Sequence, residues 1–191
     1  EKPEISTFHS LCVRILRRRI NVLGYPKQFA IYDRGDQEAL ARGALRELRI
    51  AGESLRPGEL LYFVGAWKSR GVGTREAAAM AETDKEHLAA AGYRRYQNSI
   101  KAAGAVDFDD LLLLVDQLFA EFPDVRRQEA ARFDHLLIDE YQDTNRPQYL
   151  LIRRVDSPHG IAHSRAVLTY VYWYVRTYVP YLPFIHSFIH S

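Results

Sequence analysis

The feature that most constrains this chain is an apolar run that leads directly into two adjacent acids. Residues 136–138 are Leu, Leu and Ile, and Asp139 and Glu140 follow them. Such a run is typical of a buried parallel strand that presents carboxylates at its C-terminal end, the edge where open α/β sheets bind ligands. One carboxylate there can hold a divalent metal ion while its neighbour orients or deprotonates an attacking water. The pattern predicts Asp139 as the metal-binding residue and Glu140 as the base, with a solvated turn as the alternative.

The residues around the two acids make the signal more specific. Asp139 to Asn145 read DEYQDTN, and NRPQY continues from Asn145. This string resembles the Walker B element (motif II) of the UvrD/Rep/PcrA group of superfamily 1 DNA helicases. The resemblance implies that Asp139 coordinates the Mg²⁺ of MgATP and that Glu140 activates the hydrolytic water. It also implies that Gln142 acts with Glu140 in catalysis and that Asp143 helps to bind the cofactor, so that both couple the nucleotide site to neighbouring motifs.

A second candidate site lies near the start of the chain. The string TFHS leads into a helical pattern over residues 11–20, with a cap expected at Thr7 or Ser10. Three arginines share one face of that helix, which is either a solvated face or a phosphate-contacting surface. TFHS resembles helicase motif Ib, which lies beside the single-stranded DNA track in that family. The resemblance favours nucleic-acid binding by Thr7, Phe8, His9, Arg14, Arg17 and Arg18.

Between these two stretches the sequence predicts mainly helices. Helical patterns cover residues 37–50, 57–69, 83–103, 111–122 and 124–132, with Gly92 interrupting the third. The three acids at 107, 109 and 110 are interpreted as helix caps rather than a metal site. A helix over residues 147–154 is expected to face inward through Tyr149, Leu150 and Ile152.

The family resemblance also implies the domain organisation. Residues 1–29 and 106–155 would form motor subdomain 1A, and residues 30–105 would form a helical subdomain 1B inserted into it. The expected fold class is α/β: a fragment of a P-loop NTPase (RecA-like) parallel-sheet motor domain with a mostly α-helical inserted subdomain.

Residues 156–191 depart from the family pattern. Asp156 is the last acid in the chain, so the Gly-Asp-Asp-Asp-Gln-like string that the resemblance leads us to expect is absent. The uncharged, aromatic-rich run 166–175 predicts a strand, and the chain ends in a repeated Phe-Ile-His-Ser unit. We interpret this tail as out-of-frame or unrelated sequence. Metal binding is not favoured for its histidines, which lack acid or cysteine partners: His159, His163, His186 and His190.

Composition limits the function classes only broadly. The net charge is +2, so any nucleic-acid surface must be a local cluster. Cys12 is the single cysteine, which excludes an intramolecular disulfide and fits a reducing compartment, and we expect a cytoplasmic location. No signal sequence or membrane-length apolar run is apparent. The chain starts at Glu1 and its one methionine is Met80, which favours a cut or processed start.

These observations predict a fragment of an ATP-dependent 3′-to-5′ DNA helicase. Its cofactors would be ATP and Mg²⁺, and its partners single-stranded and duplex DNA and the second RecA-like domain of the motor. No Gly-Lys-Ser/Thr phosphate loop occurs in the 191 residues, so the polypeptide alone is expected to bind MgATP poorly and to hydrolyse none. Two alternatives remain: a single-stranded nucleic-acid-binding protein without ATPase activity, and part of an RNA helicase or helicase-nuclease.

Overall fold

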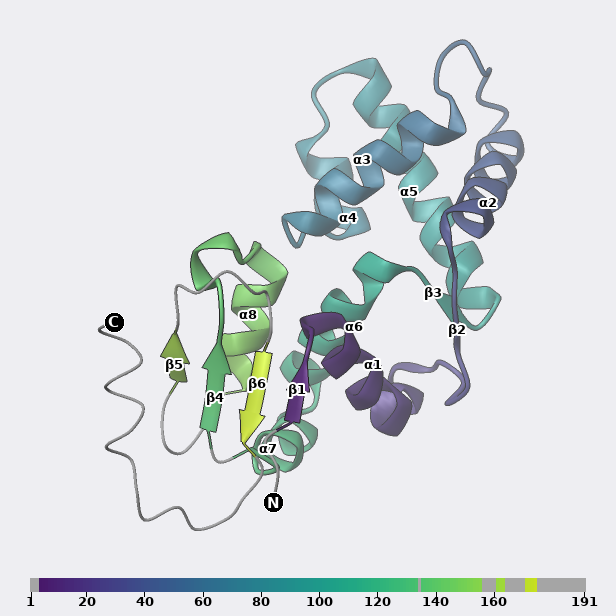
Figure 1. Ribbon diagram of the computed structural model, residues 1–191. Helices are drawn as coiled ribbons and strands as arrows, with labels where there is room; N and C mark the ends of the chain where they lie inside the picture. The colour runs from purple at the N-terminus through teal and green to yellow at the C-terminus, as the bar shows by residue number, and fades with distance from the viewer. Residues whose placement is uncertain (1–3, 134, 156–160, 164–170, 175–191) are drawn as a thin grey trace, which may run out of the picture.

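The computed structural model describes residues 4–133, 135–155, 161–163 and 171–174, most of them in helices (Figure 1). In chain order the elements are β1 (Glu4–Ser6), α1 (Phe8–Arg19), η1 (Ile20–Leu23), β2 (Ala30–Ile31), α2 (Arg34–Glu47), α3 (Pro57–Ser69), α4 (Thr74–Met80), α5 (Asp84–Ala102), β3 (Ala105–Val106), α6 (Phe108–Glu121), α7 (Pro123–Ala130), β4 (His135–Ile138), η2 (Tyr141–Asp143), α8 (Arg146–Arg154), β5 (Ile161–His163) and β6 (Val171–Tyr174).

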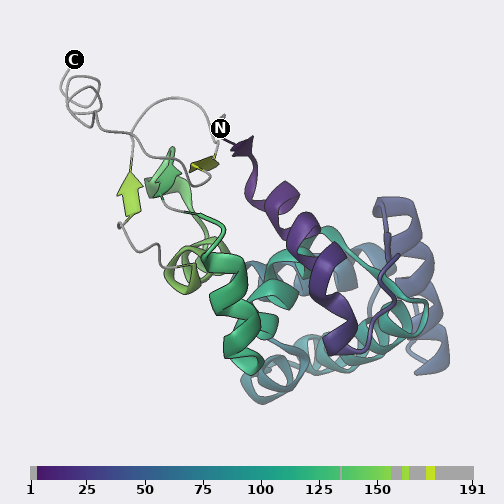
Figure 2. The same cartoon turned by 90° about the horizontal axis from the view of Figure 1, so that it is seen from below.

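In the part of the chain that the structure describes, buried apolar side chains form two separate clusters. One joins α1, η1, α6 and α8 to β4 and includes Phe29 and Val106. The other joins α2 to α5 and includes Trp67 and Ala105. We call the first group, with its strands and α7, the sheet unit, and α2 to α5 the helical unit. Figures 1 and 2 show the two units side by side, with α1 of the sheet unit packed along α6.

The chain passes between the two units at a short parallel ribbon. Ala30 of β2 pairs with Ala105 of β3, and Ile31 pairs with Val106. The buried residues at this ribbon belong to different units. Phe29, just before β2, packs in the sheet unit, and Ala105 of β3 packs in the helical unit. The assignment of the two units to helicase subdomains 1A and 1B remains a prediction.

Among the described residues, the larger sheet has four strands in the order β1-β6-β4-β5. The predicted strand before the two acids is β4, which is parallel to β5 and antiparallel to β6. β6 is also antiparallel to β1, so the sheet is mixed rather than wholly parallel. β6 occupies residues 171–174 of the run in which a strand was predicted, and the rest of that run lies outside the described residues.

The helix starts follow the predicted capping chemistry. Thr7 caps α1, and its hydroxyl accepts from the Ser10 backbone N–H. Reciprocal capping boxes begin four further helices, because a short polar side chain at the cap and an acid or amide three residues later satisfy two free backbone N–H groups. These pairs include Asp33 with Asp36, Thr83 with Glu86, Asp107 with Asp110, and Asn145 with Gln148.

The end of the helix predicted to extend to residue 50 is wrong. α2 stops at Glu47, and Arg49 takes a left-handed conformation with a φ of 54°. A residue in that region leaves the right-handed helix.

The predicted interruption at Gly92 is also wrong, because α5 runs unbroken from Asp84 to Ala102. The missing side chain at Gly92 instead leaves room for α3 to pack against α5. A Cβ there would lie 2.8 Å from Cδ1 of Leu60, so glycine allows α5 to approach α3 closely.

The inward face predicted for the helix after the two acids needs correction. In α8 the buried residues are Pro147, Leu151 and Ile152, whereas Tyr149 is 40% exposed and Leu150 is half-buried. The spacing of Pro147, Leu151 and the buried Val155 is four residues, which places these three on one helix face.

Three of the tail histidines, His159, His186 and His190, lie outside the described residues. Within the part of the chain that is described, no group of three or more His, Cys, Asp or Glu side chains is placed to hold a metal ion. No helix in that part is both long and apolar enough to cross a lipid bilayer.

Candidate nucleotide and nucleic-acid site

The two acids predicted to bind and activate the nucleotide lie just beyond the end of β4. Asp139 is buried, and its Oδ1 accepts a hydrogen bond of 3.1 Å from the backbone N–H of Glu140. Glu140 has a φ of 49°, in the left-handed region that residues with a side chain seldom adopt. This conformation turns the chain from β4 into η2, and such strained residues cluster at functional sites.

The residues of η2 hold Glu140 in place. The Gln142 side-chain amide donates to Oε2 of Glu140, and the Asp143 backbone N–H donates to the Glu140 carbonyl oxygen at 2.9 Å. Tyr141 packs against the sheet-unit core. The four residues predicted for the nucleotide site therefore lie in one tight turn, with Asp139 buried, Glu140 half-buried and Gln142 and Asp143 exposed.

This donor set fits a nucleotide-bound magnesium ion. Mg²⁺ in such sites is usually held through one or two carboxylates, while waters and phosphate oxygens complete its coordination. Asp139 supplies a carboxylate just beyond the end of a strand, and Glu140 supplies a second one from the next residue.

The predicted nucleic-acid residues at the start of α1 lie at the same edge of the sheet. Ser6, the last residue of β1, and Ile138, the last residue of β4, both pair with Val171 of β6. β1 and β4 run in the same direction, because each is antiparallel to β6. Thr7 follows Ser6, and Asp139 follows Ile138. The two residues therefore lie at the same edge of the sheet, about 10 Å apart across a single intervening strand.

Three of the predicted nucleic-acid residues, at the start of α1, lie in different environments. Thr7 is the helix cap, and Phe8 is buried in the sheet-unit core. The His9 ring stacks on the Phe108 ring, with centroids 3.8 Å apart and planes 18° apart. Burial lowers the pKa of His9, which favours the neutral imidazole at pH 7.

Phe108 is the functional candidate that the sequence interpretation missed. It is the first residue of α6 and is 54% exposed, although it is a large aromatic residue. The three acids around it predict a helix cap and say nothing of the ring itself. An apolar ring among capping acids was the available signal, because caps and first-turn positions normally carry polar side chains.

Each of the three arginines has an intramolecular contact. Arg14 donates to Ser6 Oγ at 2.8 Å, and the Arg17 guanidinium lies 4.2 Å from the centroid of the Phe29 ring. Arg18 donates to both carboxylate oxygens of Glu129. The nucleic-acid role of these arginines remains a prediction, and Arg18 would have to leave a buried carboxylate to fulfil it.

The chain matches known proteins along most of its length. The family model for the UvrD/REP helicase N-terminal domain matches residues 1–162. An ATP-dependent DNA helicase PcrA of Bacillus subtilis is 34% identical over 151 residues, which is 79% of this chain and 20% of that protein. An ATP-dependent DNA helicase UvrD1 of Mycobacterium bovis is 37% identical over 164 residues, 82% of this chain and 21% of that protein.

A PcrA helicase of Leuconostoc citreum is 36% identical over 148 residues. The chain spans about a fifth of the length of the curated relatives it matches. Because the family model covers well over half of the chain, this protein belongs to the UvrD/REP helicase family.

Proposed function

We propose that this chain is part of the ATP-hydrolysing motor of a DNA helicase. The observation that carries the proposal is the placement of Asp139 and Glu140 at the same sheet edge as Thr7 and His9. Nucleotide hydrolysis and strand binding would then share one rigid element, so that a change at one site can reach the other. The names of the relatives, ATP-dependent DNA helicases, agree with this pairing of activities.

In the nucleotide site each side chain has a distinct task. Asp139 would bind the Mg²⁺ of MgATP, and the ion would neutralise charge on the phosphate oxygens. Glu140 would orient and deprotonate the attacking water. Gln142 donates to the Glu140 carboxylate and would fix its orientation, and Asp143 at the end of η2 would help to bind the nucleotide.

On the nucleic-acid side, the exposed part of the His9–Phe108 pair would stack with a base. Base–aromatic stacking stabilises a single-stranded complex by about 1–3 kcal/mol per base and tolerates any sequence. Arg14 and Arg17 lie on the helix that carries His9 and would contact phosphates. A local surface of this kind suits a chain whose net charge is only +2.

The test requires a protein that supplies the phosphate loop, because the 191 residues contain no Gly-Lys-Ser/Thr string. The matched segment of Bacillus subtilis PcrA can be replaced by the corresponding residues of this chain. We expect ATP hydrolysis by the chimera to rise when single-stranded DNA is added. A chimera that folds and binds ATP but responds to neither DNA nor RNA would contradict the proposal, and a response to RNA alone would favour an RNA helicase.

The direction of movement rests only on the family resemblance. The expected 3′-to-5′ polarity can be measured on duplexes that carry a single-stranded tail at one end. Strand separation with a 3′ tail and none with a 5′ tail is the expected outcome, and the reverse preference would contradict it.

A further inference from the structure

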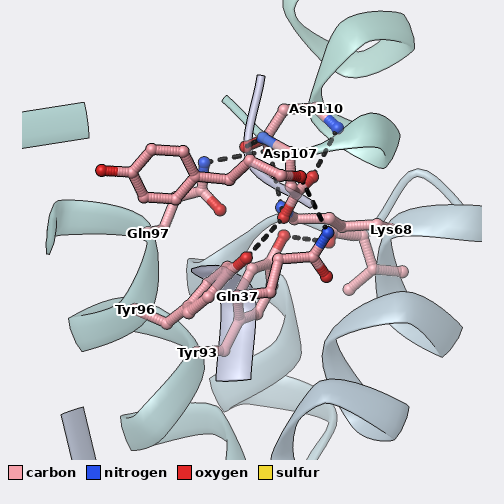
Figure 3. Close-up of polar contacts among 9 residues, drawn as sticks. Gln37, Lys68, Tyr93, Tyr96, Gln97, Asp107 and Asp110 are labelled. Atoms are coloured by element: carbon pink, nitrogen blue, oxygen red, sulfur yellow. Dashed lines mark hydrogen bonds and ion pairs between the residues drawn. The ribbon is translucent and has the colours of Figure 1, made fainter. Parts of the chain in front are cut away.

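A buried lysine joins the helical unit to the first turn of α6. Lys68 of α3 is 1% exposed, and its Nζ lies 2.6 Å from Oδ2 of Asp107 and 2.7 Å from Oδ1 of Asp110 (Figure 3). From α5, the Tyr96 hydroxyl donates to Asp107 at 2.9 Å, and the Gln97 side-chain amide donates to Asp110 at 3.0 Å. We call these five residues the junction cluster.

The charges of the junction cluster depend on one another. Burial alone would lower the pKa of Lys68, but the carboxylates of Asp110 and Asp107 outweigh it and raise that pKa, so the ammonium group keeps its proton. Burial raises the pKa of Asp110, and Lys68 opposes that rise. Without Lys68 these two buried carboxylates would have no counter-charge, which strongly disfavours their charged forms.

Each carboxylate of the cluster uses its two oxygens for different purposes. Oδ1 of Asp107 accepts from the Asp110 backbone N–H at 2.9 Å, and Oδ2 of Asp110 accepts from the Asp107 backbone N–H at 3.2 Å. The other oxygen of each carboxylate contacts Lys68. The same two side chains therefore cap α6 and anchor it to α3.

Phe108 lies within this capped turn. It follows Asp107 directly, and its ring stacks on His9. The cap therefore fixes the position of the exposed Phe108 ring, and Lys68 in turn holds the cap in place. Lys68 itself is too deeply buried to touch a bound strand.

We propose that Lys68 is a positioning residue for strand binding: it holds the first turn of α6 so that Phe108 and His9 present one stacked surface to a base. The inference rests on the proposed function, because it assigns the helical unit a role in the same nucleic-acid site. It makes the strand-contacting surface sensitive to the placement of α3 relative to α6.

The test measures base stacking separately from phosphate binding. The probe is a short single-stranded DNA that carries 2-aminopurine, whose fluorescence is quenched when the base stacks, bound to the full 191-residue chain. We expect Lys68→Met to weaken binding about tenfold, or about 1.4 kcal/mol, and to reduce the quenching. The dependence of affinity on salt should stay unchanged, because it counts phosphate contacts and Lys68 makes none.

A double-mutant cycle decides whether Lys68 acts through Phe108. If it does, Lys68→Met has no further effect on affinity in a Phe108→Ala background. Additive losses in that cycle would overturn the proposal, as would unchanged quenching in Lys68→Met. Lys85→Met is the matched control, since Lys85 is also a lysine of the helical unit that pairs with a carboxylate, that of Glu59, but at the surface.

Two further variants keep the test decisive if Lys68→Met does not fold. Tyr96→Phe removes only the hydroxyl that donates to Asp107 and should reduce quenching by a smaller amount; unchanged quenching would count against the proposal. Lys68→Met/Asp110→Asn removes one positive and one negative charge together and should recover part of the lost quenching. Failure of the unmodified chain to bind the strand at all would instead contradict the proposed function.

Discussion

The ammonium nitrogen of Lys68 lies 2.6 Å from Oδ2 of Asp107, although the two residues belong to different units of the structure. Lys68 lies on α3, which packs in the helical unit. Asp107 caps α6 immediately after the chain re-enters the sheet unit at Val106. The ion pair therefore contributes both to the stability of the chain and to the relative placement of its two units.

Removal of this lysine should have a large effect on stability. Lys68→Met leaves buried carboxylates without a counter-charge, which typically costs about 3–5 kcal/mol of the free energy of unfolding. Chemical denaturation followed by circular dichroism measures this loss. Lys85→Met removes an exposed ion pair and should have a much smaller effect, because solvent screens such pairs. Equal losses for the two variants would contradict the importance assigned to the junction cluster.

The close packing of α5 on α3 predicts opposite effects for two helical glycines. Gly92→Ala would bring a Cβ to 2.8 Å from Leu60, a fully buried side chain with little room to move, and should destabilise the chain by about 1–3 kcal/mol. Gly43→Ala in α2 meets no atom within 4 Å and should stabilise by up to about 1 kcal/mol, the ordinary helix preference for alanine. If both substitutions changed the free energy of unfolding in the same direction, this explanation of Gly92 would be refuted.

The pairing of Glu129 with two arginines predicts a pH dependence of stability. Burial alone would raise the pKa of Glu129, but hydrogen bonds from Arg18 and Arg19 outweigh it and lower the pKa below the ordinary value of 4.5. The stabilisation is therefore fully present above pH 4.5 and is lost as the pH falls through the lowered folded-state pKa.

Glu129→Gln should remove that contribution, about 1.5–3 kcal/mol at pH 7. The difference between the unmodified chain and the variant should shrink as the pH falls below the ordinary glutamate value. Glu47→Gln is the control, because Glu47 pairs with Arg95 at the exposed surface and should change stability by about 1 kcal/mol or less. Parallel pH profiles for the unmodified chain and Glu129→Gln would show that this carboxylate is not the source of the dependence.

The exposed ring of Phe108 predicts a loss of strand affinity without a change in its salt dependence. Phe108→Ala should weaken binding of single-stranded DNA by about 1–3 kcal/mol, the usual value of one base–aromatic stack. Tyr62→Ala is the matched control, since Tyr62 is a 74% exposed aromatic residue on α3 that pairs with Phe63 rather than with His9. Titrations of each variant at several salt concentrations measure both its affinity and the salt dependence of that affinity. A comparable loss in Tyr62→Ala would mean that Phe108 has no special role.

Local signals in the sequence identified most of the helices but placed several starts three residues late: the patterns begin at residues 11, 37 and 111, whereas α1, α2 and α6 begin at Phe8, Arg34 and Phe108. Asp33, Thr83 and Asp107 are short polar side chains followed by an acid three residues later, and each begins a helix as the capping rule requires. Helix ends and faces were less predictable. Whether Gly92 interrupts a helix depends on what packs against it, and Leu60 lies 32 positions away in the sequence.

The candidate site was predictable only in part, for a similar reason. Asp139 and Glu140 are adjacent in the sequence, so their pattern was visible. The stacking of His9 on Phe108 and the pairing of Lys68 with Asp107 join residues far apart in the chain. Such contacts depend on how α1, α3 and α6 pack, which no short pattern encodes.

The most direct test of the central claim compares two variants of the chimeric helicase described above. Glu140→Gln should slow ATP hydrolysis in the presence of single-stranded DNA by at least about 100-fold, the usual contribution of a general base, while MgATP binding stays close to normal. Asp139→Asn should weaken the Mg²⁺-dependent part of ATP binding. Hydrolysis at the unmodified rate by Glu140→Gln would contradict the assignment of these two acids and, with it, the account of this chain as part of an ATP-driven motor.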